Sequence, residues 1–277
     1  MGEPGYRAEL GSVCSWLYPP VHPVEEAELN DLSCLLAIDS GNTAIKWGVY
    51  AGDQWMVRSM VLQRERMLLA QAWSELPAPS LIVVSNVAGS LVARELEILL
   101  GKWSAPSMWI KAKARQCGVQ NRYDSPGQLG CDRWASLIAA WHSLRQGCLV
   151  VNAGTAMTVD ALTDTGEFLG GIIVPGFHLM RQVLPHQTGV LSISTPGNFQ
   201  RFPCNTGDAL YSGAIQALVG ALGRMYDHLA VHLNKRNLTI LLSGGDAALL
   251  SAHLRAPHQV VDNLVLAGLV VIARDAE

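Results

Sequence analysis

Two short glycine loops, each placed between two apolar runs, constrain the fold of this chain more than any other feature. The first loop covers residues 39–43 (DSGNT) and the second covers residues 152–156 (NAGTA). Each loop follows a run typical of a buried strand, and patterned apolar residues resume directly after it. The sequence therefore predicts a strand, a tight turn and a second strand, and it predicts this unit twice.

These loops carry groups suited to binding phosphate. A glycine lets the backbone approach a ligand closely, and the hydroxyl and amide groups beside it can bind phosphate oxygens. Asp39 ends an apolar strand, where its carboxylate can hold Mg²⁺ directly or through water, and Lys46 can neutralise developing charge. Two such hairpins facing each other would clamp a nucleotide. A structural alternative is a plain hairpin turn, capped by Asp39, in which Gly41 supplies a positive φ.

The composition indicates a protein with a large core that handles small molecules. Hydrophobic residues make up 49% of the 277 residues, charged residues 16%, and the net charge is −3. A nucleic-acid partner usually needs a concentrated basic face, and the closest approach to one is Lys111, Lys113 and Arg115. The six cysteines form no CxxC pair, as in proteins of reducing compartments. No apolar run approaches the roughly 20 residues of a membrane helix, and no signal-peptide pattern opens the chain. We expect a cytoplasmic protein without a nucleic-acid or membrane partner.

The order of expected elements repeats in the two halves of the chain. In the first half we expect strands at 35–38, 44–50, 55–62, 81–86 and 108–110, and helices at 64–74, 90–103 and 131–144. In the second half we expect strands at 148–152, 155–162, 168–174 and 238–243, and helices from 176, at 209–232, after 246 and at 265–273. This order predicts two β-β-β-α-β-α halves around a cleft, residues 34–146 and 147–277. Residues 1–33 form an N-terminal extension, for which we weigh disorder, or upstream sequence included by a too-early start codon, against an ordered docking segment, which we favour less.

A third segment, residues 123–133 (YDSPGQLGCDR), lies between the loops. Gly130 can close a turn, so that Asp132 and Arg133 fall in the first turn of the following helix. The helix dipole favours an acid there, which accounts for Asp132 but not for Arg133. A carboxylate beside a transferred phosphoryl group can accept the proton of the attacking hydroxyl, and a neighbouring arginine can stabilise the moving charge.

With this segment included, the chain resembles the type III pantothenate kinases, of the actin-like, sugar-kinase-like ATPase superfamily. The family pattern is DxGNT, YxxPxxLGxDR, DxGTA, GGxIxPG and a downstream NT. The corresponding segments here are residues 39–43, 123–133, 152–156, 170–176 and 205–206. Together they span nearly the whole chain after the extension. Gly170, Gly171 and Gly176 would allow a tight pocket wall, although ordinary turn chemistry at strand ends explains them equally well.

The resemblance implies a duplicated ribonuclease-H-like (actin-like ATPase) fold and ATP-dependent phosphorylation of pantothenate to 4′-phosphopantothenate, the first step of coenzyme A biosynthesis. It also implies a homodimer, Mg²⁺ with ATP, and a monovalent cation, K⁺ or NH₄⁺. Asp132 would be the general base and Asp39 would hold Mg²⁺. The ATP phosphates would be bound by Asp39, Ser40, Gly41, Asn42, Thr43, Lys46, Gly154 and Thr155. Pantothenate would be bound by Tyr123, Gly130, Arg133 and Thr206.

One position departs from the family pattern. The family usually opens its second loop with an aspartate that is associated with monovalent-cation binding, whereas this chain has Asn152. An amide oxygen can still coordinate K⁺ but brings no negative charge, so the cation site should be weaker or built differently. Asp160, on the following strand, keeps an acid nearby.

Two other functions stay open on the sequence. The first is phosphorylation of another small hydroxyl or carboxylate compound, although the segment 123–133 does not follow the sugar-kinase pattern. The second is a non-catalytic regulatory protein of the same fold. The presence of Asp39, Asp132 and Arg133 together argues against an inactive enzyme.

Overall fold

The computed structural model describes residues 34–188 and 197–276, with the backbone alone considered at 184–188. The first sheet has the strand order β3-β2-β1-β4-β5. Three of its strands form an antiparallel meander: β1 (Leu35–Ser40), β2 (Ala44–Ala51) and β3 (Gln54–Leu62). The other two, β4 (Leu81–Asn86) and β5 (Ser107–Trp109), run parallel to β1. The expectation for residues 1–33 lies outside the described residues.

The second sheet repeats this plan. Its order is β12-β11-β8-β9-β10-β7-β6. The meander consists of β8 (Cys148–Ala153), β9 (Ala156–Leu162) and β10 (Glu167–Pro175). The parallel strands are β11 (Thr239–Ser243) and β12 (His258–Val260). Both sheets thus place a three-strand meander beside two parallel strands in the order 3-2-1-4-5, which confirms the predicted duplicated ribonuclease-H-like fold.

Two further strands extend the second sheet beyond β10. They are β6 (Arg115–Gln116) and β7 (Val119–Asn121), of which β7 runs parallel to β10. The sequence predicts no strand there or at β12, because two or three residues are too few to show a period. The helix expected at 64–74 is instead a 3₁₀ helix, η1 (Gln63–Leu68), followed by the short α2 (Leu69–Ala72). Residues 115–121 therefore join the sheet of the second half, and the division at 146/147 stays a prediction.

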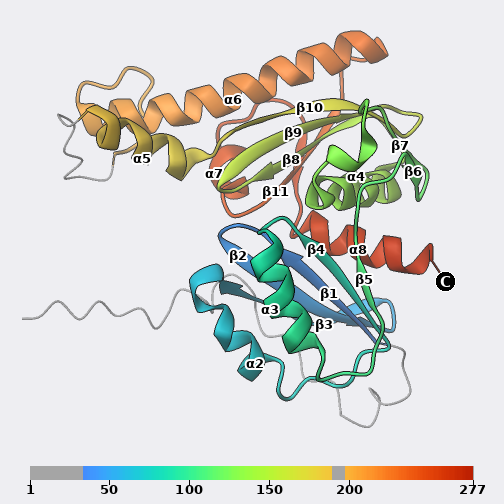
Figure 1. The fold of residues 1–277 in the computed structure, drawn as a ribbon. Helices are drawn as coiled ribbons and strands as arrows, with labels where there is room; N and C mark the ends of the chain where they lie inside the picture. Colours follow the sequence, from blue (N-terminus) through green and yellow to red (C-terminus); the bar gives the residue numbers. More distant parts are fainter. Residues whose placement is uncertain (1–33, 189–196, 277) are drawn as a thin grey trace, which may run out of the picture.

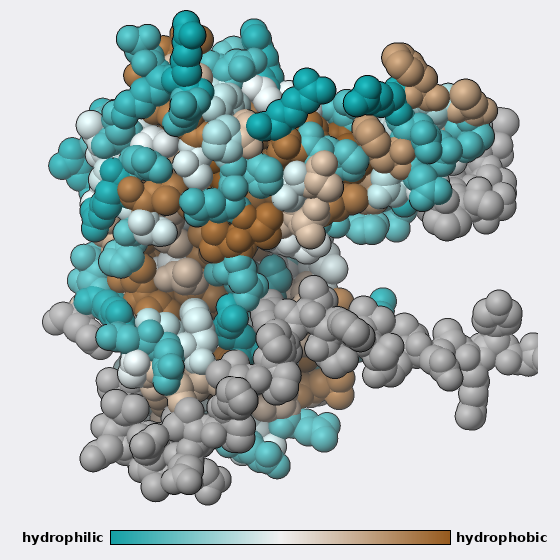
Figure 2. All heavy atoms as spheres, turned by 180° about the vertical axis from the view of Figure 1, so that it is seen from behind, coloured by the Kyte–Doolittle hydropathy of each residue, from teal (hydrophilic) through white to brown (hydrophobic). Residues whose placement is uncertain are grey.

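Helices cover both outer faces and fill the space between the sheets (Figure 1). On the first sheet, α2 and α3 (Ser90–Leu100) lie outside. On the second sheet, the outer helices are α5 (Phe177–Thr188), α6 (Thr206–Leu233) and α7 (Ala247–Ser251). Seen from behind, α5 and α6 project as an arm beyond the rest of the upper layer (Figure 2). Within the described residues, no helix combines the length and apolar character needed to cross a membrane.

The layer between the sheets consists of α4 (Cys131–Leu144) and α8 (Leu264–Arg274). These helices pack so closely that only a glycine fits at position 268. A Cβ atom added there would lie 1.9 Å from the carbonyl oxygen of Ala135. Alternate residues of each central strand face opposite sides of the sheet and so enter two different cores. Along β8, Leu149 and Val151 face the outer helices, whereas Cys148 and Val150 face the central layer. The central layer matters for function because the first turn of α4 enters the candidate site.

Candidate active site

The two glycine loops meet across the molecule. The hydroxyl oxygens of Thr43 and Thr155 form a hydrogen bond of 2.5 Å, although the residues lie 112 positions apart in the chain. Gly41 does not have a positive φ, so the turn-only explanation offered for it does not apply. A Cβ atom added at Gly154 would meet no atom within 4 Å, which leaves open space above the second loop. The predicted juxtaposition of the loops is therefore present.

Three glycines of the segment 170–176 have three different structural reasons. Gly170 has a φ of +130°, a conformation that favours glycine. A Cβ atom at Gly171 would lie 2.1 Å from Oδ1 of Asp160, and one at Gly176 would lie 1.9 Å from the carbonyl oxygen of Gly154. Gly170 lies inside β10 at the register shift between Phe168 and Gly170, so its positive φ belongs to a bulge and not to a turn at a strand end. Gly176 allows the end of β10 to pack against the second loop.

Asp39 is a buried carboxylate at the end of β1. Its side chain accepts no hydrogen bond from the described residues, and Lys46 lies opposite it on β2. The pKa of Asp39 is raised to about 7, chiefly by burial; Lys46 opposes this shift, and the negative charge of Asp132 adds to it. A buried carboxylate without a hydrogen-bond donor is costly, so this group fits a bound cation.

Asp132 lies in the first turn of α4, as predicted. Gly130 is the N-cap residue of that helix, and Oδ1 of Asp132 accepts a hydrogen bond of 2.8 Å from the backbone N–H of Arg133. A Cβ atom at residue 130 would lie 2.5 Å from the same oxygen, so the glycine makes room for the carboxylate. The half-buried side chain of Asp132 lies close enough to Asp39 to affect its pKa. The structure therefore brings both predicted carboxylates into one site.

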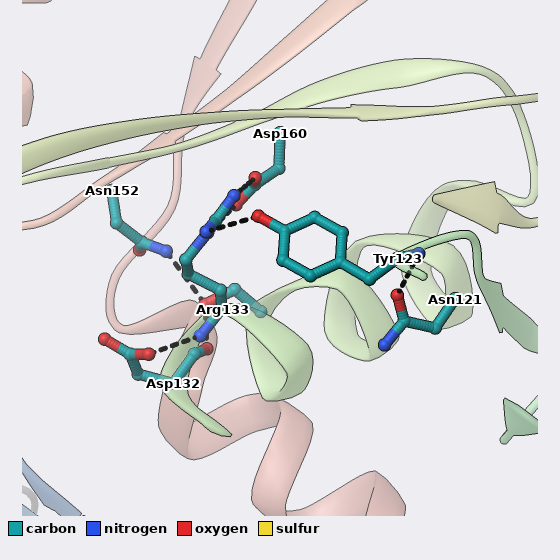
Figure 3. Close-up of polar contacts among 7 residues, drawn as sticks. Asn121, Tyr123, Asp132, Arg133, Asn152 and Asp160 are labelled. Carbon is teal, nitrogen blue, oxygen red and sulfur yellow. Dashed lines mark hydrogen bonds and ion pairs between the residues drawn. The ribbon is translucent and has the colours of Figure 1, made fainter. Parts of the chain in front are cut away.

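Arg133 forms a buried ion pair with Asp160 of β9 (Figure 3). Its Nε donates to Oδ2 of Asp160 at 3.1 Å, Nη2 donates to Oδ1, and Nη1 donates to the Tyr123 hydroxyl at 3.1 Å. Burial alone would lower the pKa of Arg133, but the Asp160 carboxylate raises it above its usual value. Two N–H groups of the guanidinium remain after these contacts. Arg133 and Tyr123 thus lie together, with most of the guanidinium committed inside the protein.

Asn152 connects the second loop to the helix that carries Asp132. Its Nδ2 donates a hydrogen bond of 3.0 Å to Oγ of Ser136, and Ser136 donates one of 2.9 Å to the carbonyl oxygen of Asp132 (Figure 3). The amide N–H group of Asn152 is therefore used in a hydrogen bond within the protein, to the first turns of α4.

Comparison with known proteins gives the family of this chain. A family model described as Type III pantothenate kinase matches residues 35–228. This chain belongs to the type III pantothenate kinases. A relative of that name from Nitrosomonas eutropha is 57% identical over 248 residues, covering 89% of this chain and 96% of the relative. Another from Nitrosospira multiformis is 52% identical over 241 residues, covering 87% and 91%.

A structural comparison shows the fold alone. A solved structure of a Baf family transcriptional activator from Campylobacter jejuni superposes with a TM-score of 0.54 and 19% identity. It covers 87% of this chain and 98% of that one. At this identity the likeness concerns the arrangement of the helices and strands.

The last of the residues that the resemblance assigns to pantothenate is Thr206. Thr206 is the first residue of α6 and is exposed. Among the described residues, no hydrogen bond joins it to Tyr123, Gly130 or Arg133. Asn205, just before it, caps the helix by accepting from the backbone N–H of Asp208 at 2.9 Å.

Three residues that support the site were missed or left unpaired in the sequence analysis. Gln63 donates to the carbonyl oxygen of Gly41 at 2.7 Å and to Oγ of the buried Ser40 at 3.3 Å, which fixes the first loop. Ser136 joins Asn152 to α4. Asp160 was noticed but not assigned to Arg133, although a fully buried acid requires a partner. Gln63 and Ser136 carry no comparable signal in the sequence.

Proposed function

We propose that this kinase transfers the γ-phosphoryl group of ATP to the primary hydroxyl of pantothenate, with Asp132 as general base. The observation that carries the proposal is the meeting of the two loops at Thr43 and Thr155 beside two interacting carboxylates. Phosphoryl transfer leaves a protein little covalent work, so catalysis depends on positioning and on charge. Asp132 accepts the hydroxyl proton, and the exposed Asn42, Thr43 and Thr155 contact the phosphates.

Asp39 is the residue we assign to Mg²⁺. When bound with ATP, the ion neutralises charge on the transferred phosphoryl group. The buried, unpartnered carboxylate of Asp39 suits this role, and Lys46 supplies a second positive charge beside it. Within the described part of the chain, no group of three or more metal-binding side chains is present.

We assign the pantothenate pocket to Tyr123, Gly130 and Arg133, with Thr206 as a further contact. We propose a homodimer in which a second copy supplies Thr206, which is exposed at the first residue of α6. Arg133 keeps two N–H groups for a substrate oxygen while Asp160 holds it in place. We place this enzyme in the cytoplasm, without a nucleic-acid or membrane partner.

Asn152 sets the expectation for K⁺ and NH₄⁺. Its amide nitrogen is bound to Ser136, so only its neutral oxygen is left for a cation. We propose that a monovalent cation has at most a weak effect on this enzyme.

An acceptor screen tests the proposal. ADP release from ATP and Mg²⁺ is measured with pantothenate, acetate and several sugars at equal concentration. We expect turnover with pantothenate alone. Turnover with another acceptor, and none with pantothenate, would show that pantothenate is not the substrate. A folded protein that releases no ADP with any acceptor would favour the regulatory alternative.

A further inference from the structure

A cavity lies at the opposite end of the central helix layer from the candidate active site. Its volume is about 530 Å³, within the range of small-molecule sites. Asp132 lies in the first turn of α4, whereas Arg145, which ends that helix, lines the cavity. At 1.5 Å per residue these positions are about 20 Å apart. Its lining includes Arg274 at the C-terminal end of α8 and Cys117 in the turn between β6 and β7, segments that Figure 1 draws on the same side of the molecule.

Both layers of the molecule contribute walls to the cavity. The first sheet supplies Tyr50 and Trp55, whose rings lie 5.0 Å apart in an edge-to-face arrangement. Helix α8 supplies an apolar floor of Ala267, Val270 and Val271. An aromatic wall beside an aliphatic floor suits a flat apolar group.

The charged groups around the cavity favour an anion. Arg145 lines it, and its guanidinium makes no ion pair with a described carboxylate. Arg274 also lines it, while pairing with Asp53 and lying over the ring of Tyr50 at 5.1 Å. His142 adds a third basic side chain.

The acid in the wall is Asp275, next to Cys117. Burial and this neighbouring carboxylate raise the pKa of the Cys117 thiol to about 12, so the thiol stays neutral. Since Arg274 is already paired with Asp53, Arg145 is the lining arginine that forms no ion pair with a described carboxylate.

The backbone around the cavity gives an independent reason to think that its side chains matter. Five described residues other than glycine have a positive φ, and three of them are Asn or Asp, which tolerate it. The other two are Cys117 (φ 50°) and Arg145 (φ 48°), and both line this cavity.

Glycine or asparagine would suit both positions better. Cys117 stands in the two-residue turn between β6 and β7, and Arg145 ends a helix. Two side chains, those of Cys117 and Arg145, are therefore present at the cavity although the positive φ at both positions favours glycine or asparagine.

We infer that this cavity is a second ligand site, which binds a small organic anion with a flat apolar group against Tyr50 and Trp55 and its negative charge against Arg145. The site is distinct from the site for ATP and pantothenate. Because its walls come from both layers, a bound ligand connects the two sheets at the end of α4 remote from Asp132.

The test uses the full chain and two fluorescent probes of the same shape. 8-Anilinonaphthalene-1-sulfonate carries one negative charge, and N-phenyl-1-naphthylamine carries none. We expect one saturable site for the sulfonate that persists with saturating ATP, Mg²⁺ and pantothenate. Displacement by those substrates, or no saturable binding, would overturn the inference.

A variant that favours the backbone separates binding from folding. Arg145→Gly removes the guanidinium and relieves the positive φ, so we expect an equal or higher melting temperature. Sulfonate affinity should fall about tenfold or more, while the neutral probe should bind as before. Asn234→Gly is the matched control, because Asn234 ends α6 with φ 51° and does not line the cavity. Unchanged sulfonate binding in Arg145→Gly, or an equal loss in the control, would contradict the assignment.

Discussion

The ends of the two central strands, β1 and β8, occupy equivalent positions in the duplicated fold. Asp39 on β1 lies opposite Ser85 on the neighbouring parallel strand, and Asn152 on β8 lies opposite Ser243. Each serine then contacts the first residue of the central helix of its half. Oγ of Ser85 donates to Sγ of Cys131 at 3.3 Å, and Oγ of Ser243 accepts from the backbone N–H of Leu264 at 3.3 Å. The duplication therefore extends from strand order to single residues.

The chemistry at these equivalent positions differs. Asp39 faces Lys46 across its hairpin, whereas Asn152 faces Thr158 across the other. The carboxylate of Asp39 has no hydrogen-bond donor in the described protein, whereas the amide of Asn152 is bound to Ser136. The first half thus keeps charge available for a ligand, and the second half uses a neutral group to hold α4. The following predictions test this division, beginning with the largest effect.

Asp132→Asn should lower kcat by about 10²–10⁴-fold, because an amide cannot accept the proton of the attacking hydroxyl. The ATP affinity and the melting temperature should change little, since the side chain is half-buried and its contact with the Arg133 N–H can be kept by the amide oxygen. Steady-state kinetics and ATP titration measure these quantities. Asp124→Asn, at an exposed acid of the same segment, is the control. Full activity in Asp132→Asn would exclude Asp132 as the base.

Asp39→Asn should reduce the rate at saturating Mg²⁺ by about 10²-fold, equivalent to roughly 2.7 kcal/mol of lost charge stabilisation. An amide keeps the shape of the side chain and removes its charge. The rate is followed as a function of Mg²⁺ concentration in both proteins. If the variant reached the wild-type rate at high Mg²⁺, the first half would not be the source of the charged chemistry.

The same substitution should stabilise the free protein at high pH. The pKa of Asp39 is raised to about 7 in the folded state, against about 3.9 in an unfolded chain. The folded state therefore holds a proton that the unfolded state has lost, and stability falls as pH rises from about 4 to 7. Urea unfolding should show Asp39→Asn to be more stable than wild type by about 1–4 kcal/mol at pH 8, with a smaller gain at pH 5. An equal difference at both pH values would contradict the raised pKa.

Asn152→Asp makes the second half more like the first and should have the smallest effect. The added charge should increase the stimulation of activity by K⁺ over Na⁺ by roughly 0.2–1 kcal/mol, about 1.5–5-fold. Ser136→Ala is the companion variant, because it breaks the contact to α4 without adding charge. It should lower kcat modestly and leave the K⁺ response unchanged. A K⁺ response that stayed as weak in Asn152→Asp as in wild type would show that residue 152 does not govern the cation.

Much of the fold could be predicted because its main elements are long and periodic. The bounds of α4 and β4 match the expected ranges, since α4 has an apolar stripe and β4 a continuous apolar run. The position of β6 and β7 in the second sheet could not be predicted, because the pairing of β7 with β10 is set by tertiary contacts. The packing of α8 against α4 likewise depends on Gly268, whose need for a missing Cβ is visible only in three dimensions.

The site divides in the same way. Asp39, Asp132 and the loop threonines stand in motifs, so the sequence placed them in one site. The pairing of Arg133 with Asp160 was within reach, because a charged residue inside the apolar strand β9 must find a partner. The hydrogen bonds of Gln63 and Ser136 could not be predicted. Neither residue belongs to a motif, and each acts only through its position in the folded chain.

The most direct test of the account is ADP release by the wild-type protein with ATP and Mg²⁺, with and without pantothenate, first in Na⁺ buffer and then in K⁺ buffer. We predict turnover that requires pantothenate and changes little between the two cations, because the charged chemistry lies in the first half and Asn152 is neutral. Turnover that requires K⁺, or no pantothenate-dependent turnover in either buffer, would contradict this account.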